Sequence, residues 1–374
     1  MKGRKRDWQE AMENSLPPLP EKKKFSPRFD LPELASYEGK FKAEYWSKWV
    51  VRKMRKTSTD KSWVSHVELR KLAEKSGMRD RFMMERVCSR LEKGAEVGVE
   101  GRGRLPTRGK NSPTVYEHGH AVADALQEGI VEGYLTGPYS EEELVALVGK
   151  DFTVSPMSCR EKPNGKQRII VDASAPYDKD ISVPGWLWSP EKPGSINSTI
   201  DIEKYPAKMS SVPKFVRTLY RVGRGARVCK IDQTSAYKHQ HIVKEDWKLQ
   251  IVEWGGKFFM EMRLMFGTKS SPGIYDELHK TFLHSIIEMT PDFSKDDVEQ
   301  HLDDVLGVGP AEVDESKSVD AFFRIYLEEA SRVGFRVDSK GDTDKVQPPS
   351  TVCTALGVMF DTVAWTWNLK DNSG

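Results

Sequence analysis

After residue 228, short apolar strands alternate with amphipathic helices in a defined order. The pattern predicts, in turn, a strand at 228–231, a hairpin across 249–262, a helix over 271–289, a hairpin over 297–308, a helix over 319–333, and strands at 355–360 and 363–369. Hairpins join neighbouring strands in antiparallel pairs, and the helices between them need a sheet face to cover. The order therefore predicts an α+β fold, an antiparallel sheet with helices packed on one face.

Two further signals lie upstream of this region. The β-branched stretch 168–172 follows an Asn164-Gly165 pair, which predicts a hairpin. An apolar stripe predicts a helix over 116–134, and Ser140 with Glu143 has the form of a capping box that begins a second, short helix.

The first 112 residues have a different composition. Residues 1–36 mix charges with proline and predict a flexible leader. The region 37–112 is expected to be mainly helical and to end in a Gly/Arg linker; between Lys48 and Lys110 it has 18 Lys and Arg against 8 Asp and Glu. Such a surplus fits either a polyanionic partner or a solvated helical surface. Residues 113–374 are expected to form a second unit.

Composition excludes several classes of protein. Hydrophobic residues make up 38% of the chain, and no apolar run approaches the roughly 18 residues of a membrane span. The basic N-terminus has no apolar core behind it, so it is not a secretory signal. The four cysteines lie far apart without a CxxC pair, which argues against a disulfide scaffold or zinc knuckle and favours a reducing, intracellular location in cytoplasm or nucleus.

Three aspartates end strands or occupy turns: Asp232, Asp303 and Asp304. Two adjacent carboxylates at a hairpin tip repel each other, and a divalent cation relieves this repulsion. An exposed acidic turn is the alternative interpretation. His239 and His241 are interpreted as histidines on a strand surface rather than as metal ligands.

Six segments together resemble, in their order, those of a reverse transcriptase. They are KPNGKQRIIVDAS (162–174), KIDQTSAYKHQHI (230–242), WGGKFFMEMRLMFGTKSSP (254–272), HLDDVLGVG (301–309), VGFRVDSKG (333–341) and ALGVMFD (355–361). In these segments the chain is most similar to retrotransposon enzymes, and among these it resembles the tyrosine-recombinase (DIRS-like) group. The resemblance implies the fingers and palm of a right-hand polymerase over 113–374.

The resemblance also implies roles for single residues. Asp232, Asp303 and Asp304 would be catalytic and would hold two Mg²⁺ ions, or Mn²⁺. The implied dNTP-binding residues are Lys162, Lys166, Arg168, Tyr237 as a steric gate against ribonucleotides, Phe266, Gly267 and Lys340, and the implied primer-binding residues are Leu356 and Gly357. Taken alone, Arg168 could be a surface strand residue, Tyr237 a core residue and Lys340 plain solvated surface.

The implied function is RNA-directed DNA polymerisation, a nucleotidyl transfer with an RNA template, a DNA primer and dNTPs as partners and no membrane. Two departures from the family pattern stand out. His301 occupies a position that is usually aromatic, and only a few residues follow 361, so we expect no thumb. The alternative function is therefore a truncated or inactive polymerase-derived protein that binds nucleic acid through the basic region, with Trp46, Trp49 and Trp63 as stacking residues.

Overall fold

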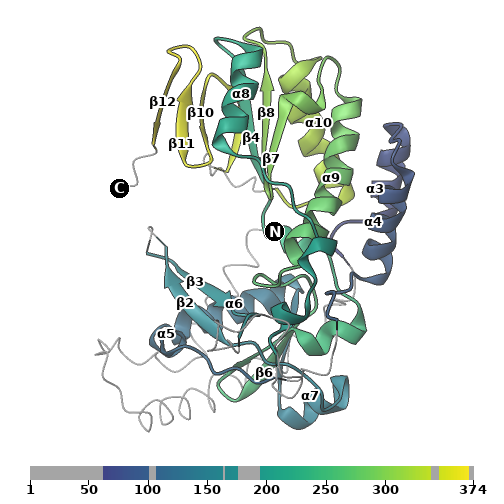
Figure 1. Ribbon diagram of the computed structural model, residues 1–374, viewed down its shortest axis with the longest axis vertical. Helices are drawn as coiled ribbons and strands as arrows, with labels where there is room; N and C mark the ends of the chain where they lie inside the picture. Colours follow the sequence, from purple (N-terminus) through teal and green to yellow (C-terminus); the bar gives the residue numbers. More distant parts are fainter. Residues whose placement is uncertain (1–61, 101–106, 163–164, 176–193, 338–344, 370–374) are drawn as a thin grey trace, which may run out of the picture.

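The structure, a computed structural model, describes residues 62–100, 107–162, 165–175, 194–337 and 345–369 (Figure 1). The expected leader 1–36, Trp46, Trp49 and Lys340 lie outside these ranges. Figure 1 shows an upper half built around one sheet and a lower half built around a second sheet and a hairpin.

The sheet of the upper half has four antiparallel strands in the order β7-β8-β4-β9. Its strands are β4 (Arg227–Asp232), β7 (Val298–His301), β8 (Asp304–Gly309) and β9 (Val346–Ser350). Side chains alternate between its faces: Cys229 and Ile231 join one hydrophobic cluster, whereas Val228 joins another. The expected strand at 228–231 and the hairpin around Asp303-Asp304 are confirmed.

Two long helices cover the first face of this sheet. They are α9 (Ser271–Met289) and α10 (Ser318–Val333), which have the expected bounds to within one residue. Phe282 of α9 and Phe322 of α10 pack with Ile231 in a single buried cluster. The helix α10 ends at Gly334 in the left-handed conformation, as a helix C-terminus commonly does.

The second face is covered by a helix and a small sheet. They are α8 (Val212–Val222) and the sheet of β10 (Val352–Ala355), β11 (Val358–Asp361) and β12 (Thr366–Leu369). Phe215 and Leu219 of α8 pack with Val228 of β4. The expectation that helices cover one face only is therefore wrong, because the apolar stripe of α8 lies on the face opposite α9 and α10.

The lower half contains a three-stranded sheet and a hairpin. The sheet, in the order β1-β6-β5, has the strands β1 (Leu135–Tyr139), β5 (Ile251–Trp254) and β6 (Lys257–Glu261), and the hairpin pairs β2 (Met157–Glu161) with β3 (Gln167–Val171). The helices α5 (Pro113–Glu117), α6 (Gly119–Glu132) and α7 (Glu141–Val148) lie around them. The single helix expected over 116–134 is broken at His118, and the capping box at Ser140 is confirmed.

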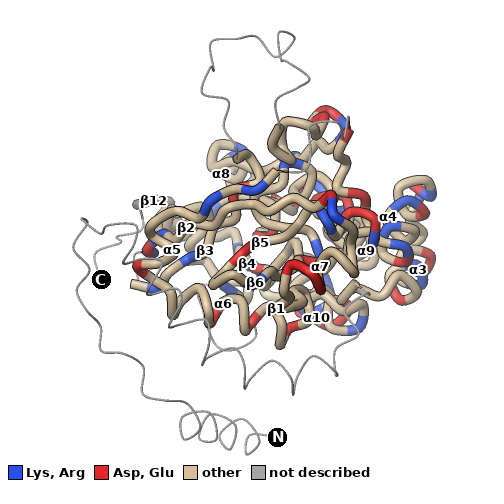
Figure 2. Tube along the Cα trace, turned by 90° about the horizontal axis from the view of Figure 1, so that it is seen from below, with Lys and Arg blue, Asp and Glu red and all other residues tan. Residues whose placement is uncertain are grey.

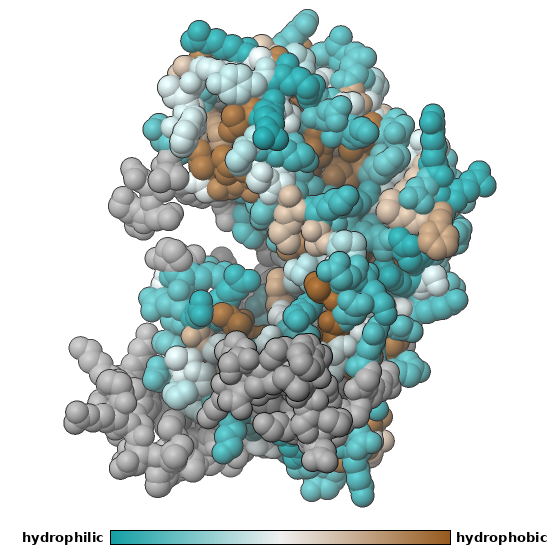
Figure 3. All heavy atoms as spheres, in the orientation of Figure 1, coloured by the Kyte–Doolittle hydropathy of each residue, from teal (hydrophilic) through white to brown (hydrophobic). Residues whose placement is uncertain are grey.

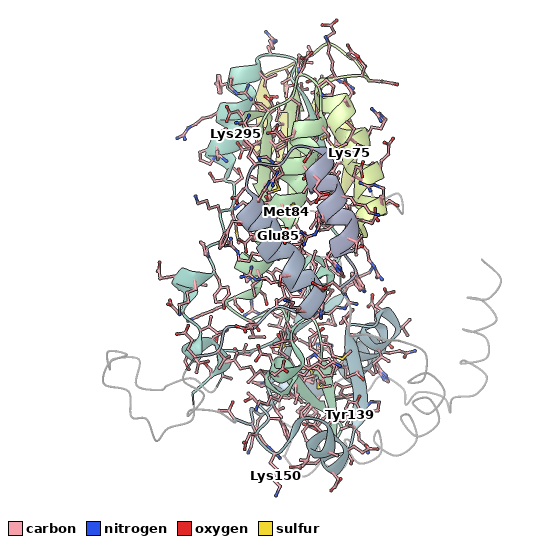
Figure 4. The ribbon with its side chains drawn as sticks, turned by 90° about the vertical axis from the view of Figure 1, so that its right-hand side faces the viewer. Lys75, Met84, Glu85, Tyr139, Lys150 and Lys295 are labelled. Atoms are coloured by element: carbon pink, nitrogen blue, oxygen red, sulfur yellow. The ribbon has the colours of Figure 1, made fainter. Side chains whose placement is uncertain are left out.

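The basic region contributes two helices, α3 (His66–Lys75) and α4 (Arg81–Lys93), which lie on the outside of the upper half. Figure 4 views this side and labels Lys75 of α3 and Glu85 of α4. Arg86 and Arg90 both pair with Glu277 of α9, and acidic and basic residues alternate along both helices (Figure 2). Two helices thus lie within the described part of the basic region, residues 62–100 and 107–112. Residues 37–61 and most of the expected Gly/Arg linker lie outside the described residues, so the mainly helical region and its boundary at residue 112 stay predictions.

The face drawn in Figure 3 is hollowed between the upper half and the β2–β3 hairpin of the lower half. Among the described residues, no helix has the length and apolar character needed to cross a membrane.

Candidate active site

The pairing of β4 with β8 brings two of the predicted catalytic carboxylates together. In the antiparallel ladder Asp232 is the direct partner of Asp304. Residues two apart in a strand share a face, so both side chains lie on the same face as Val228, at the end of the ladder. Since α8 and β10 cover only the apolar part of that face, the two carboxylates stand at its polar margin.

The third aspartate sits at the tip of the β7–β8 hairpin, where His301 pairs with Asp304 across a loop of Leu302 and Asp303. Leu302 has a φ of +59°, which is unusual for a bulky side chain. The Gln233 amide N–H donates to the Asp303 carbonyl at 3.1 Å and joins the tip to the end of β4. The three aspartates are thus held together by backbone pairing.

Burial and mutual repulsion govern the charges of these carboxyls. Burial and then the neighbouring Asp304 charge raise the pKa of Asp232 to about 6, against the opposing charge of Lys345. Burial also raises the pKa of Asp303. Lys345 Nζ lies 3.8 Å from Asp232 Oδ1, and Lys230 Nζ lies 3.5 Å from Asp304 Oδ1. Sequence reasoning missed both lysines, because nothing local marks them as partners of the aspartates.

The donor set suits a hard cation. Asp304 Oδ1 is buried and accepts no hydrogen bond, and its nearest cationic group is the Lys230 ammonium at 3.5 Å, so its lone pairs suit a cation as ligand. Across the described part of the chain, no group of three or more His, Cys, Asp or Glu side chains is arranged to hold a metal ion. Mg²⁺ commonly uses only one or two carboxylates together with substrate phosphates, so the residues fit an ion that arrives with a nucleotide.

Tyr237 and Phe266 form an aromatic wall beside the aspartates. Tyr237, on the short 3-10 helix η5 (Ala236–His239), is 6% exposed, and its ring centroid lies 4.4 Å from that of Phe266, which is 39% exposed. Burial and the Asp303 charge raise the pKa of Tyr237 to about 12. The Arg168 guanidinium lies over the Phe266 ring at 5.9 Å, so the structure brings these predicted nucleotide-side residues together.

Gly267 ties this wall to the β2–β3 hairpin. Its φ is +103°, and a Cβ placed there would lie 2.3 Å from the Val171 carbonyl oxygen. The buried Asn197 amide donates to the Gly267 carbonyl at 2.7 Å and to Ser174 Oγ at 2.8 Å. The conformational freedom of glycine is therefore used at this close backbone approach.

The remaining predicted nucleotide and primer residues are more peripheral. Lys162 and Lys166 are exposed at the loop end of the β2–β3 hairpin. Leu356 and Gly357 were expected to lie within a strand. They form instead the two-residue turn between β10 and β11, with φ values of +52° and +78°. The single strand expected over 355–360 is therefore wrong in its bounds, because this turn separates the end of β10 at Ala355 from the start of β11 at Val358.

The histidines also differ from expectation. His239 and His241 are buried rather than on a strand surface. His239 Nε2 accepts from the Arg336 amide at 2.8 Å, and His241 Nδ1 lies 2.6 Å from Ser62 Oγ. His301 is half-buried, with Nδ1 2.8 Å from the Ser210 carbonyl oxygen.

No protein-family model matches the sequence, and no curated protein matches it. A structure of the foamy viral protease-reverse transcriptase in complex with RNA/DNA hybrid has a TM-score of 0.50 and 13% identity over 82% of this chain and 36% of that chain. The native protease-reverse transcriptase of prototype foamy virus has a TM-score of 0.47 and 16% identity over 70% of this chain and 28% of that chain. The chain thus spans about a third of the length of these proteins, and its described part has a reverse-transcriptase-like fold.

Proposed function

We propose that the chain is the RNA-directed DNA polymerase core of a retroelement. The observation that carries the proposal is the pairing of Asp232 with Asp304 across β4 and β8, with Asp303 on the adjoining hairpin tip. Three carboxylates would suit transfer of a negatively charged nucleotidyl group through the divalent cations they would hold, because those cations would neutralise charge on the phosphates.

The proposed reaction joins a primer 3′-hydroxyl to the α-phosphorus of a dNTP. A new P–O bond forms, the bond from the α-phosphorus to the β-phosphate oxygen breaks, pyrophosphate leaves, and the proton of the 3′-hydroxyl is released to water. Asp232, Asp303 and Asp304 are the residues that would hold Mg²⁺, and two such ions, when bound, supply charge neutralisation at the attacking and leaving oxygens.

The other side chains of the site position the nucleotide. The buried Tyr237 ring, held against Phe266, closes the space that a ribose 2′-hydroxyl would need. Arg168 lies beside Phe266 and suits contact with the triphosphate, because a guanidinium binds phosphate oxygens in pairs. We assign the more peripheral lysines, Lys162 and Lys166, to phosphate contacts and the Leu356-Gly357 turn to the primer.

Primer extension on poly(rA)/oligo(dT) tests the proposal. The wild-type protein should extend the primer in the presence of Mg²⁺, and Asp303→Asn should abolish extension. Asp292→Asn is the matched control, because Asp292 is an exposed aspartate whose side chain is 71% accessible, and it should extend normally. Equal activity of the Asp303→Asn and control variants would show that the catalytic assignment is wrong.

A binding-only protein is the second candidate, and it predicts salt-sensitive nucleic-acid binding that ignores Mg²⁺ and dNTP. One of its expected stacking residues already has protein partners: the Arg336 guanidinium lies 3.4 Å from the centroid of the Trp63 ring, and the Arg263 guanidinium lies 4.8 Å from it. The tyrosine-recombinase (DIRS-like) retrotransposon origin is also part of our proposal. Recombinase coding sequence near this reading frame would support it, and integrase coding would contradict it.

A further inference from the structure

The peptide before the catalytic Asp-Asp pair is held by a buried histidine. The carbonyl oxygen of Leu302 lies 3.0 Å from His279 Nδ1 and 3.2 Å from Gln300 Nε2. Leu302 occupies the left-handed region, a conformation that a leucine keeps only when its surroundings enforce it. The two donors at its carbonyl supply this restraint.

The opposite edge of the same imidazole reaches the end of β4. Because a carbonyl oxygen only accepts, Nδ1 carries the proton and Nε2 is an acceptor. Tyr326 Oη lies 2.9 Å from Nε2 and donates to it, and Tyr326 Oη in turn accepts from Gln233 Nε2 at 2.6 Å. Gln233 directly follows Asp232 in the chain, and its Oε1 accepts from the Tyr275 hydroxyl.

His279, Gln233, Tyr275 and Tyr326 are all buried, and each is satisfied within this network. Buried polar networks of this kind fix one arrangement, because a lost member leaves its buried partners without hydrogen bonds. The network spans from α9 and α10 to both backbone segments that carry the aspartates.

We propose that His279 is a positioning residue that couples the end of β4, which carries Asp232, to the hairpin tip that carries Asp303 and Asp304. This inference rests on the proposed polymerase function. Without the imidazole, Leu302 can relax from its left-handed conformation and the tip aspartates shift relative to Asp232. Displacements of about 1 Å at reacting groups can cost on the order of 100-fold in rate.

The test compares His279→Leu, which keeps bulk but no hydrogen bonds, with His279→Gln, which can donate and accept. His284→Ala is the control, since His284 lies on the same helix with its side chain 45% exposed. Primer extension gives kcat and the KM for dTTP, electron paramagnetic resonance gives Mn²⁺ binding in the presence of dTTP, and amide hydrogen exchange reports on residues 302–304. Tyr326→Phe, which removes one hydroxyl, is measured in the same way and decides the question if His279→Leu does not fold.

We expect His279→Leu to lower kcat at least tenfold and to weaken Mn²⁺ binding with little change in KM, while His279→Gln recovers most of both. Folded His279→Leu, or Tyr326→Phe in its place, with kcat, Mn²⁺ binding and exchange equal to the control would overturn the inference and leave the polymerase proposal intact. Wild-type protein that fails to extend primers overturns the polymerase proposal instead. The inference is then judged by hydrogen exchange alone, where faster exchange of residues 302–304 than in the control supports it and equal exchange refutes it.

Discussion

The ring of Tyr237 packs against the ring of Phe266 with the two planes tilted by 43°. Tyr237 is buried and Phe266 is partly exposed, so Tyr237 forms the inner part of the aromatic wall and Phe266 its outer part. A wall of this kind excludes atoms by shape rather than by charge.

Tyr237→Ala should therefore reduce discrimination between dTTP and UTP at least tenfold, because it opens space beneath the sugar. The ratio of kcat/KM for the two nucleotides measures this effect. Tyr237→Phe keeps the ring and should discriminate like the wild type, and Tyr220→Ala, at a tyrosine that is 67% exposed, is the surface control. Unchanged discrimination in a folded Tyr237→Ala variant would show that Tyr237 is not the steric gate.

Gly267→Ala should separate the β2–β3 hairpin from the aromatic wall. The new methyl group would meet the Val171 carbonyl oxygen at 2.3 Å, on a residue whose φ is +103°. We expect a loss of at least 2 kcal/mol in the free energy of unfolding, on the order of other strained backbone changes, and a raised KM for dNTP. Gly165→Ala has a similar φ of +75° but open space around it, and it should cost only about 1 kcal/mol. Equal losses in the two variants, measured by urea unfolding, would contradict the steric account.

A buried ion pair lies directly behind the aromatic wall. Lys238 Nζ donates to Glu261 Oε2 at 2.7 Å and to the Leu264 carbonyl at 3.1 Å, and it lies 5.7 Å from the centroid of the Phe266 ring. Lys238→Met leaves the Glu261 carboxylate buried without this partner, so we expect about 3–5 kcal/mol of destabilisation.

The double variant Lys238→Met/Glu261→Gln should be more stable than Lys238→Met alone, because it also removes the buried charge. Lys257→Met, on the same strand as Glu261, is a control for loss of a lysine from this sheet. Urea unfolding of the wild type, Lys238→Met, Glu261→Gln and the double variant measures the coupling between the two residues. Additive losses would show that Lys238 and Glu261 do not stabilise each other.

The sequence predicted the elements whose signals are local. The helix α9 begins beside Pro272 and has the expected bounds, and the capping box of α7 is present, because proline placement and capping depend on neighbouring residues alone. The face chosen by α8 could not be predicted, because the stripe of Phe215 and Leu219 shows only that the helix packs. The turn at Leu356-Gly357 was missed because leucine rarely adopts a positive φ.

The candidate site likewise has residues that the sequence predicted and residues that it did not. The resemblance to reverse transcriptases predicted Asp232 and Asp304 as site residues, and the two are direct partners in the ladder of β4 and β8. It did not reveal Lys345, which reaches Asp232 only because β9 pairs with β4. It also did not reveal His279. Nothing in the sequence of its helix marks this histidine, because its partner is the Leu302 carbonyl of the hairpin tip, which is distant in the chain.

The last prediction concerns acid stability and His239. Its Nδ1 lies 2.8 Å from the Ala236 carbonyl and its Nε2 accepts from the Arg336 amide, so only the neutral ring satisfies both partners. Burial lowers the pKa of His239 from 6.5 to about 3. Between these values the unfolded chain binds a proton that the folded protein does not, so stability should fall as the pH drops below about 6.5. The loss should reach a few kcal/mol by pH 4. Urea unfolding at pH 7 and pH 5 measures it. His239→Gln should reduce the dependence but not remove it, because burial also lowers the pKa of His279, to about 4, whereas His284→Gln should leave it unchanged. An unchanged slope in folded His239→Gln would mean that another group causes the acid sensitivity.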